Sequence, residues 1–122
     1  MQALLALGAS AAIDGPAGPH RLPLYAFVTG VRRTALAPGE IVTHISVPPQ
    51  PEAATSAFVK LGARRYLVIS IAMVSAVLAP AADGTIAHAR VAVGACSPVA
   101  MRLGTLEAAL LGRPLAEAAA TT

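Results

Sequence analysis

The clearest pattern in the chain is the alternation of apolar and polar positions over residues 40–47. Ile41 and Ile45 fall on one face of this segment, as expected for a half-buried β-strand. Val42 falls on the opposite face, where the other side chains are mostly polar. The pattern therefore predicts a strand in which Val42 is an apolar position on a polar face.

A second alternating segment, residues 85–93, follows a long apolar run over residues 67–79. The apolar run predicts a central strand that is buried on both faces. The alternating segment predicts an antiparallel return strand whose outward face carries Ile86, His88 and Arg90. This face would be open to solvent or to a partner protein.

The other expected elements are shorter and depend on helix formers, turn residues and caps. Gly8 and Gly112 suit helix C-caps because glycine adopts left-handed backbone angles without strain. We expect helices over residues 1–7, 105–111 and 115–120, strands over 10–14, 20–24 and 56–61, and a bend over 27–30. The first and last helices lack a clear start and end, which suggests a piece of a larger protein.

Residues 48–52 contain three prolines and form the best domain boundary in the chain. We expect one unit over residues 1–50 and a second over residues 51–122. Strands and helices are segregated in the second unit, with an antiparallel sheet first and helices after it. The fold class predicted from this order is α+β.

Composition excludes several classes of protein. Apolar residues make up 56% of the 122 residues and charged residues only 12%, which excludes a disordered chain. A single cysteine, Cys96, excludes a disulfide scaffold and favours the cytoplasm. The net charge of +3 comes from scattered arginines, and the few aromatic residues offer no stacking platform, so we expect no nucleic-acid partner.

Two segments resemble membrane or export signals without meeting their requirements. Residues 66–82 are uncharged, but they are fewer than the roughly 20 that a spanning helix needs, and they include Pro80. Residues 1–13 are apolar, but no basic residue precedes Arg21, so the basic region of a signal peptide is missing. We therefore expect a cytoplasmic protein that does not cross a membrane.

The residues give little support for catalysis or metal binding. Three histidines lie far apart in different elements, and together with Cys96 they predict no metal site; we assign no catalytic residue. The pairs Arg32–Arg33 and Arg64–Arg65 have two open interpretations. They are solvated loop charges, or they contact an anion such as a cofactor phosphate or a partner carboxylate.

Four motifs follow one another along nearly the whole chain. They are Phe27-x-x-Gly30-x-x-x-Thr34-x-Leu36-x-Pro38-Gly39-Glu40-Ile41, Ser56-Ala57-Phe58-x-Lys60-Leu61-Gly62-x-Arg64-Arg65, Asp83-Gly84-x-Ile86 with Ala89-Arg90-Val91-Ala92-Val93-Gly94, and Glu107-Ala108-Ala109-Leu110-Leu111-Gly112-Arg113-Pro114-Leu115. In this order and spacing the chain resembles the FAD-binding medium subunit of molybdenum hydroxylases. That family includes the carbon monoxide dehydrogenase flavoprotein and the flavin portion of xanthine dehydrogenase.

The resemblance implies a truncated fold. Residues 1–50 would be the C-terminal part of the FAD-binding α/β domain. Residues 51–122 would be the family's small C-terminal domain, a three-stranded antiparallel sheet with packed helices, without its last helices. The Gly-rich segments that hold the FAD pyrophosphate in the family have no counterpart here, since the chain contains no Gly-Gly pair.

The resemblance also implies a cofactor, partners and site residues. Val42 and Lys60 would contact the flavin, and Arg64 would lie in a loop near it. Lys60 could place positive charge near the isoalloxazine ring, and this charge would stabilise reduced anionic flavin. The parent enzymes pass electrons from the iron-sulfur small subunit and the molybdenum-cofactor large subunit through FAD to NAD or another acceptor.

Two functions remain open for this chain. The first is an FAD half-site in a molybdenum hydroxylase flavoprotein, in which the short chain is inactive alone. The alternative is a non-catalytic docking module without a cofactor, which would bind a partner subunit through the face of Ile86, His88 and Arg90. The sequence does not reveal the substrate of the parent complex, the electron acceptor or the oligomeric state.

Overall fold

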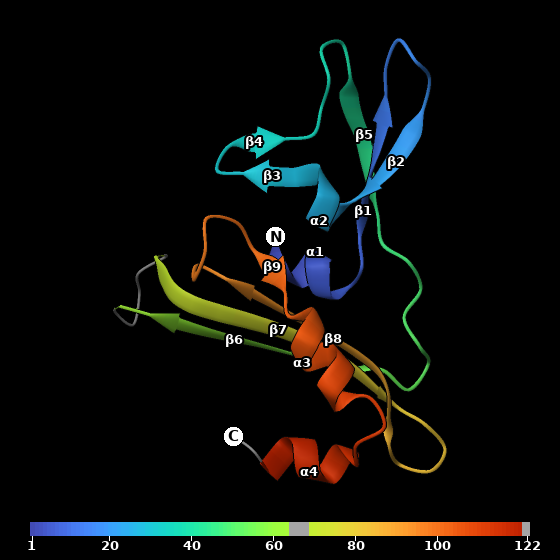
Figure 1. The fold of residues 1–122 in the computed structure, drawn as a ribbon, viewed down its shortest axis with the longest axis vertical. Helices are drawn as coiled ribbons and strands as arrows, with labels where there is room; N and C mark the ends of the chain where they lie inside the picture. Colours follow the sequence, from blue (N-terminus) through green and yellow to red (C-terminus); the bar gives the residue numbers. More distant parts are fainter. Residues whose placement is uncertain (64–68, 121–122) are drawn as a thin grey trace.

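The structure is a computed structural model that describes residues 1–63 and 69–120. Over these ranges the chain forms a three-stranded sheet, a two-stranded ribbon and a four-stranded sheet, all antiparallel. Figure 1 shows the three-stranded sheet in the upper part of the molecule and the four-stranded sheet below it, with the first helix between them. The mixed fold with antiparallel sheets confirms the predicted α+β class.

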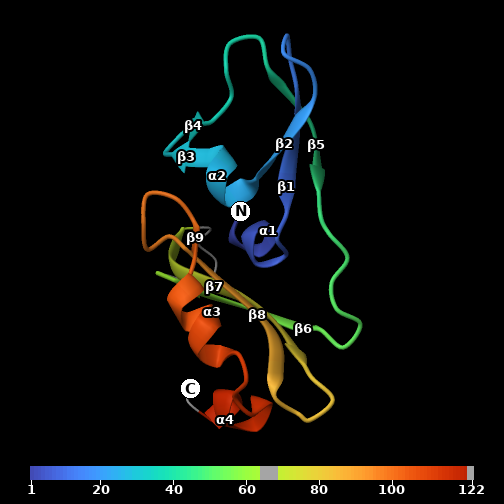
Figure 2. The ribbon, with the colours of Figure 1, turned by 45° about the vertical axis from the view of Figure 1, so that its right-hand side comes forward.

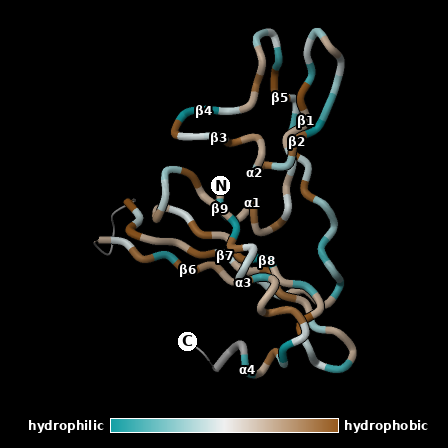
Figure 3. Tube along the Cα trace, viewed as in Figure 1, coloured by the Kyte–Doolittle hydropathy of each residue, from teal (hydrophilic) through white to brown (hydrophobic). Residues whose placement is uncertain are grey.

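The three-stranded sheet has the order β2-β1-β5, with β1 (Ser10–Asp14) in the centre. β2 (His20–Pro23) and β5 (Ile41–Ser46) flank it. The expected hairpin of β1 and β2 is present, and Figure 3 shows its loop in hydrophilic colours. α1 (Gln2–Ala6) precedes this sheet and ends before Gly8, whose φ of +70° satisfies the predicted glycine cap.

A β-bulge in β5 corrects the predicted faces of that strand. Ala12 of β1 pairs with His44, whereas its neighbour Ile13 pairs with Val42, so Thr43 is the extra residue. The Thr43 hydroxyl donates a hydrogen bond to the Ala12 carbonyl oxygen at 3.2 Å. Because the bulge breaks the alternation, Val42 lies on the face of Ile13, which is 1% exposed, and not on the polar face with His44.

Between the hairpin and β5 the chain forms a short helix and a ribbon, where the sequence predicted only a bend. α2 (Leu24–Phe27) leads into β3 (Val28–Gly30), which pairs with β4 (Arg33–Thr34). Leu24 and Phe27 are buried, so α2 covers the inner face of the three-stranded sheet. Arg32 lies in the turn between β3 and β4, and Arg33 begins β4. Both are exposed, which is compatible with solvated charge and with an anion contact.

The four-stranded sheet has the order β6-β7-β8-β9. β6 (Thr55–Gly62), β7 (Ser70–Pro80) and β8 (Ile86–Gly94) are the three strands that the sequence predicts. β9 (Met101–Arg102) adds a two-residue strand at the far edge, where it pairs with Ala92 and Val93. Residues 67–68 of the predicted central strand lie outside the described ranges.

Two helices follow the sheet. α3 (Gly104–Leu110) packs against β8, and α4 (Leu115–Ala120) comes after Gly112, whose φ is +76°. Within the described ranges, no helix is both long enough and apolar enough to cross a membrane. Figures 1 and 2 show α3 and α4 at the end of the molecule remote from the β1–β2 hairpin.

One hydrophobic core joins the two predicted units. α1 contacts both β7 and β8, and its side chains share a cluster with residues of both sheets. The buried members of this cluster are Leu5, Ala6, Ala9, Ala11, Ile13, Leu24, Phe27, Val77 and Ala92. The linker after β5 therefore connects two sheets that are packed together through α1 (Figure 2).

The predicted outward face of β8 is wrong. Ala92 lies on the face of Arg90 and is fully buried. Ile86 is 1% exposed, but the register shift between Ala79 and Pro80 pairs it with Pro80 and places it on the other face of the strand. α1 packs from the other half of the chain on the face of Arg90 and Ala92, and it covers that face. At the opposite end of the strand, the backbone of Ile86 exchanges hydrogen bonds with Gly112 and Arg113. The docking surface that the alternative function required is therefore not available on this face.

Candidate functional site

Val42 is a partly exposed apolar residue on the inner face of the three-stranded sheet. Its side chain is 38% exposed, next to Ile45 at 41%. Ile13, the direct partner of Val42 on β1, is buried beneath the same face. This arrangement provides a small apolar surface supported by a rigid strand, which a flat aromatic ring could cover.

Lys60 lies near the end of β6 and is exposed. It is paired with Met73 of β7, so the two side chains share one face of the sheet. Gln2 of α1 donates a hydrogen bond to the Met73 sulfur at 2.9 Å, which identifies this face as the one that carries α1. Lys60 therefore places an ammonium group on the side of the sheet that faces the first half of the chain.

The two predicted site residues that the structure describes, Val42 and Lys60, do not contact each other. Val42 and Lys60 belong to different sheets, and Figure 1 shows β5 and β6 well apart. Arg64 lies outside the described residues. A ligand that touches both Val42 and Lys60 must therefore bridge the two sheets.

The chemistry of these two positions fits part of FAD. A half-exposed valine suits the apolar ring system, and an exposed lysine suits its carbonyl oxygens or a negative charge on it. In the structure as described, we assign no residue to the FAD pyrophosphate. The residues present thus fit the flavin end of the cofactor and leave the phosphate end unassigned.

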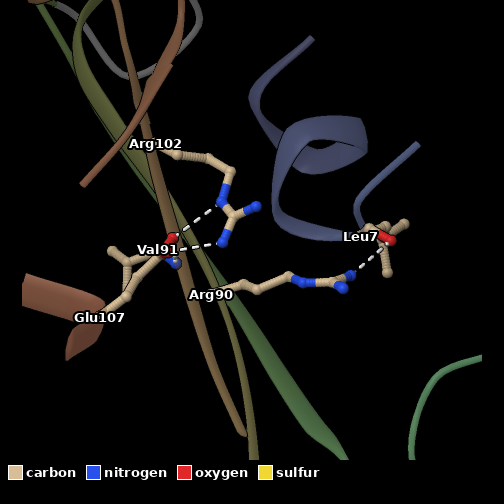
Figure 4. Close-up of polar contacts among 5 residues, drawn as sticks. All are labelled: Leu7, Arg90, Val91, Arg102 and Glu107. Carbon is tan, nitrogen blue, oxygen red and sulfur yellow. Dashed lines mark hydrogen bonds and ion pairs between the residues drawn. The ribbon is translucent and has the colours of Figure 1, made fainter. Parts of the chain in front are cut away.

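A hydrogen-bonded junction fixes the relative positions of the two halves. The Leu7 carbonyl oxygen accepts a hydrogen bond from Arg90 Nη1 at 3.0 Å (Figure 4). It accepts another from Gln50 Nε2, also at 3.0 Å. Leu7 ends α1, Gln50 lies in the linker and Arg90 lies in β8, so one carbonyl ties three segments together. Glycine suits this position because its φ is +70°, and a Cβ atom here would displace the Arg90 guanidinium.

Glu107 is a buried carboxylate to which sequence reasoning assigned no role. It is 7% exposed, and its Oε1 accepts hydrogen bonds from the Val91 amide and from Arg102 Nε, both at 2.9 Å (Figure 4). Burial raises the pKa of Glu107, but the hydrogen bonds from Arg102 and Val91 outweigh burial and lower it overall. The only sequence signal is an acidic residue five positions after an arginine in an otherwise apolar helix.

His88 has a buried Nε2 atom without a hydrogen-bond partner, on the same face of β8 as Arg90. Burial is the main cause that lowers the pKa of His88, and the positive charges of Arg90 and Arg102 lower it further. Glu107 acts in the opposite direction. The folded protein therefore holds His88 in its neutral form more strongly than the unfolded chain does.

This shift predicts a loss of stability in mild acid. The unfolded chain protonates His88 near the ordinary pKa of 6.5, whereas the folded chain resists protonation, so stability is present above this pH and falls below it. We expect the urea midpoint to fall between pH 7.5 and pH 5.5, and to fall less in His88→Gln. His44→Gln is the control, since it removes an exposed histidine and should keep the full fall. Equal pH dependence in both variants would contradict the assignment.

Two open grooves lie beside the junction of β9 and α3. One has a volume of about 500 Å³ and the other about 550 Å³, and both include Arg102 and Gly104 in their walls. Glu107 neutralises Arg102, so neither groove offers an uncompensated charge to a ligand. Among the residues that the structure describes, no cluster of three histidine, cysteine or acidic side chains could hold a metal ion. Cys96 is exposed.

The fold agrees with the comparisons to known proteins. Residues 1–50 match the FAD binding domain in molybdopterin dehydrogenase, and residues 57–122 match the CO dehydrogenase flavoprotein C-terminal domain. The chain belongs to this flavoprotein family and corresponds to the C-terminal portion of its FAD-binding medium subunit. No curated protein sequence matches it.

Solved structures of CO dehydrogenases and a related oxidoreductase have the same fold. CO dehydrogenase from Hydrogenophaga pseudoflava, in a form that lacks the Mo-pyranopterin moiety, is 29% identical with a TM-score of 0.83. Reconstituted CO dehydrogenase from Oligotropha carboxidovorans is 23% identical with a TM-score of 0.82, a likeness of fold alone. Quinoline 2-oxidoreductase from Pseudomonas putida 86 is 26% identical with a TM-score of 0.76.

The matched region is only part of those proteins. The similarity covers 93%, 92% and 96% of this chain, in the same order, but only 39%, 38% and 40% of the chains to which it is similar. This chain therefore spans less than half the length of the flavoprotein chains it matches.

Proposed function

We propose that this chain is the C-terminal part of the flavoprotein subunit of a molybdenum hydroxylase, where it forms the flavin-contacting wall of the FAD site. The observation that carries the proposal is the pair of family matches, which occur in order along one chain and meet in one shared core. FAD, when bound, supplies the electron-transfer chemistry. The chain's own residues would bind and orient the ring.

Each proposed contact has a physical role. Val42 would cover the apolar ring from a strand that the bulge at Thr43 turns toward the core. Lys60 would stabilise negative charge on the ring from the α1 face of the other sheet. Arg64 would lie in the loop beyond β6, near the same end of the cofactor. The hydrogen bonds at Leu7 would keep the two walls in register.

The electrons would arrive from an iron-sulfur small subunit and a molybdenum-cofactor large subunit, and NAD or another acceptor would remove them. Two of the similar structures are CO dehydrogenases, and one of these lacks the Mo-pyranopterin moiety. The lone cysteine favours the cytoplasm as the site of this complex.

A titration with two flavins tests the half-site. If the chain contacts the ring and not the pyrophosphate, it should bind riboflavin and FAD about equally well. The fluorescence of each flavin should be quenched on binding, and the two dissociation constants should agree within about threefold, a difference under about 1 kcal/mol. Circular dichroism would confirm that the chain is folded. A folded chain that binds neither flavin, or that prefers FAD more than tenfold over riboflavin, would overturn the half-site.

A further inference from the structure

The longest open strand edge in the described structure is that of β6. Its eight residues pair with β7 along one side, from Thr55 opposite Leu78 to Gly62 opposite Ser70. Within residues 1–63 and 69–120, no strand pairs with its other side. Seven of the eight residues are exposed. The backbone amides and carbonyls along the free side are therefore available to a further strand.

The other sheet edges carry features that block such pairing. β5 contains the bulge at Thr43, which twists the strand and interrupts its ladder. β2 has only four residues and ends at Pro23, which cannot donate a backbone hydrogen bond. β9 has two residues. β6 has no proline, and its only register shift falls at its last residue, Gly62.

The side chains of β6 are apolar on both faces of the sheet. Phe58 is 56% exposed on one face, and Val59 and Leu61 are 67% and 58% exposed on the other. Lys60 is the single charged residue of the strand. A strand added at this edge would give each of these side chains a cross-strand neighbour on its own face, and an apolar neighbour would bury more apolar surface than a polar one.

We propose that β6 pairs antiparallel with β6 of a second copy of this chain, about a two-fold axis at Phe58, to form a continuous eight-stranded sheet. This arrangement places the two Phe58 rings opposite each other, as a cross-strand aromatic pair. It sets Lys60 opposite Ser56 of the second copy, so the two ammonium groups lie on opposite sides of the axis, four residues apart along the strands. Pairing of one copy's β6 with another copy's β5 would not close and would build a filament.

The inference is independent of the proposed function, because the interface uses the backbone edge of β6 and needs no cofactor. Sedimentation equilibrium in the absence of flavin should give a mass near twice the 12.2 kDa of one chain at high concentration. Phe58→Lys sets like charges opposite each other at the axis and should raise the dimer dissociation constant at least about tenfold. Ile41→Lys, the same change at a residue 64% exposed on the β5 edge, should leave it unchanged.

A second measurement tests the register without relying on a disruptive variant. With Cys96→Ser as background, nitroxide labels on Val59→Cys lie two residues apart across an axis at Phe58, whereas labels on Thr55→Cys lie six residues apart. The latter separation is about 20 Å along the strands. We expect the shorter inter-label distance at position 59. A monomer at every concentration, equal distances at the two positions, or dissociation by Ile41→Lys alone would overturn the proposal.

Discussion

Val42→Asp is expected to weaken riboflavin binding at least about tenfold, which corresponds to about 1.4 kcal/mol. The change places a carboxylate where the proposed site has an apolar surface, and desolvation of that charge against the ring opposes binding. The backbone should not change, because β5 is paired with β1 on both sides of the bulge and Val42 is already 38% exposed. Fluorescence titration of the purified variant gives the dissociation constant.

Val47→Asp is the matched control for that experiment. It makes the same chemical change at a residue of similar exposure, 44%, just beyond the end of β5. Its dissociation constant for riboflavin should stay within about twofold of that of the unmodified chain. A twofold change corresponds to about 0.4 kcal/mol, which is the usual size of the effect of a surface substitution. If both variants bind riboflavin as the unmodified chain does, Val42 does not contact the ring. The family assignment would remain.

Glu107→Ala is expected to lower the free energy of unfolding by about 2–4 kcal/mol. The variant leaves the Val91 amide without its acceptor and Arg102 without its carboxylate, in a place where Glu107 is 93% covered. The loss of the hydrogen bonds to a buried ionised group dominates, because the alanine side chain replaces none of them. Urea unfolding at pH 7 and at one protein concentration measures the change.

A double variant separates the ion pair from the backbone contact. In Arg102→Met with Glu107→Leu, both charged partners are replaced by apolar groups, so the unpaired charge disappears and only the Val91 amide stays unsatisfied. We expect the double variant to recover at least half of the stability lost in Glu107→Ala. Glu52→Ala, at an exposed linker position, is the control and should shift stability by less than about 0.5 kcal/mol. If the double variant instead loses the sum of the stabilities lost in the two single variants, the broken Arg102–Glu107 pair is not the source of the destabilisation.

Local patterns were sufficient for most elements of secondary structure. The strands that became β1, β2, β6 and β8 were predicted because turn residues and alternation act within a few positions. The glycines after α1 and α3 were predicted as caps because positive φ is a local requirement. The family resemblance followed from the same local motifs, taken in order.

The candidate site was less accessible to such reasoning. Val42 was placed on a polar face because alternation was extended through Thr43, and a bulge is visible only in the pairing with Ala12. Arg90 was placed on an outward face because it alternates with the apolar face of residues 85–93. Its true partner, the carbonyl of Leu7, lies 83 positions away in sequence.

The sequence by itself determined most of the longer elements, the α+β class and the family, because each of these depends on residue types at short separations. Only the tertiary structure decided which faces are buried. α1 packs on β7 and β8 and joins the two units in one core, and this long-range contact covers Ala92. A register shift at Pro80 turns Ile86 to the other face of β8, where it is buried as well. Side-chain orientation at β5 and β8 depends on register and on a helix from the other half of the chain, and neither is encoded within the strands themselves.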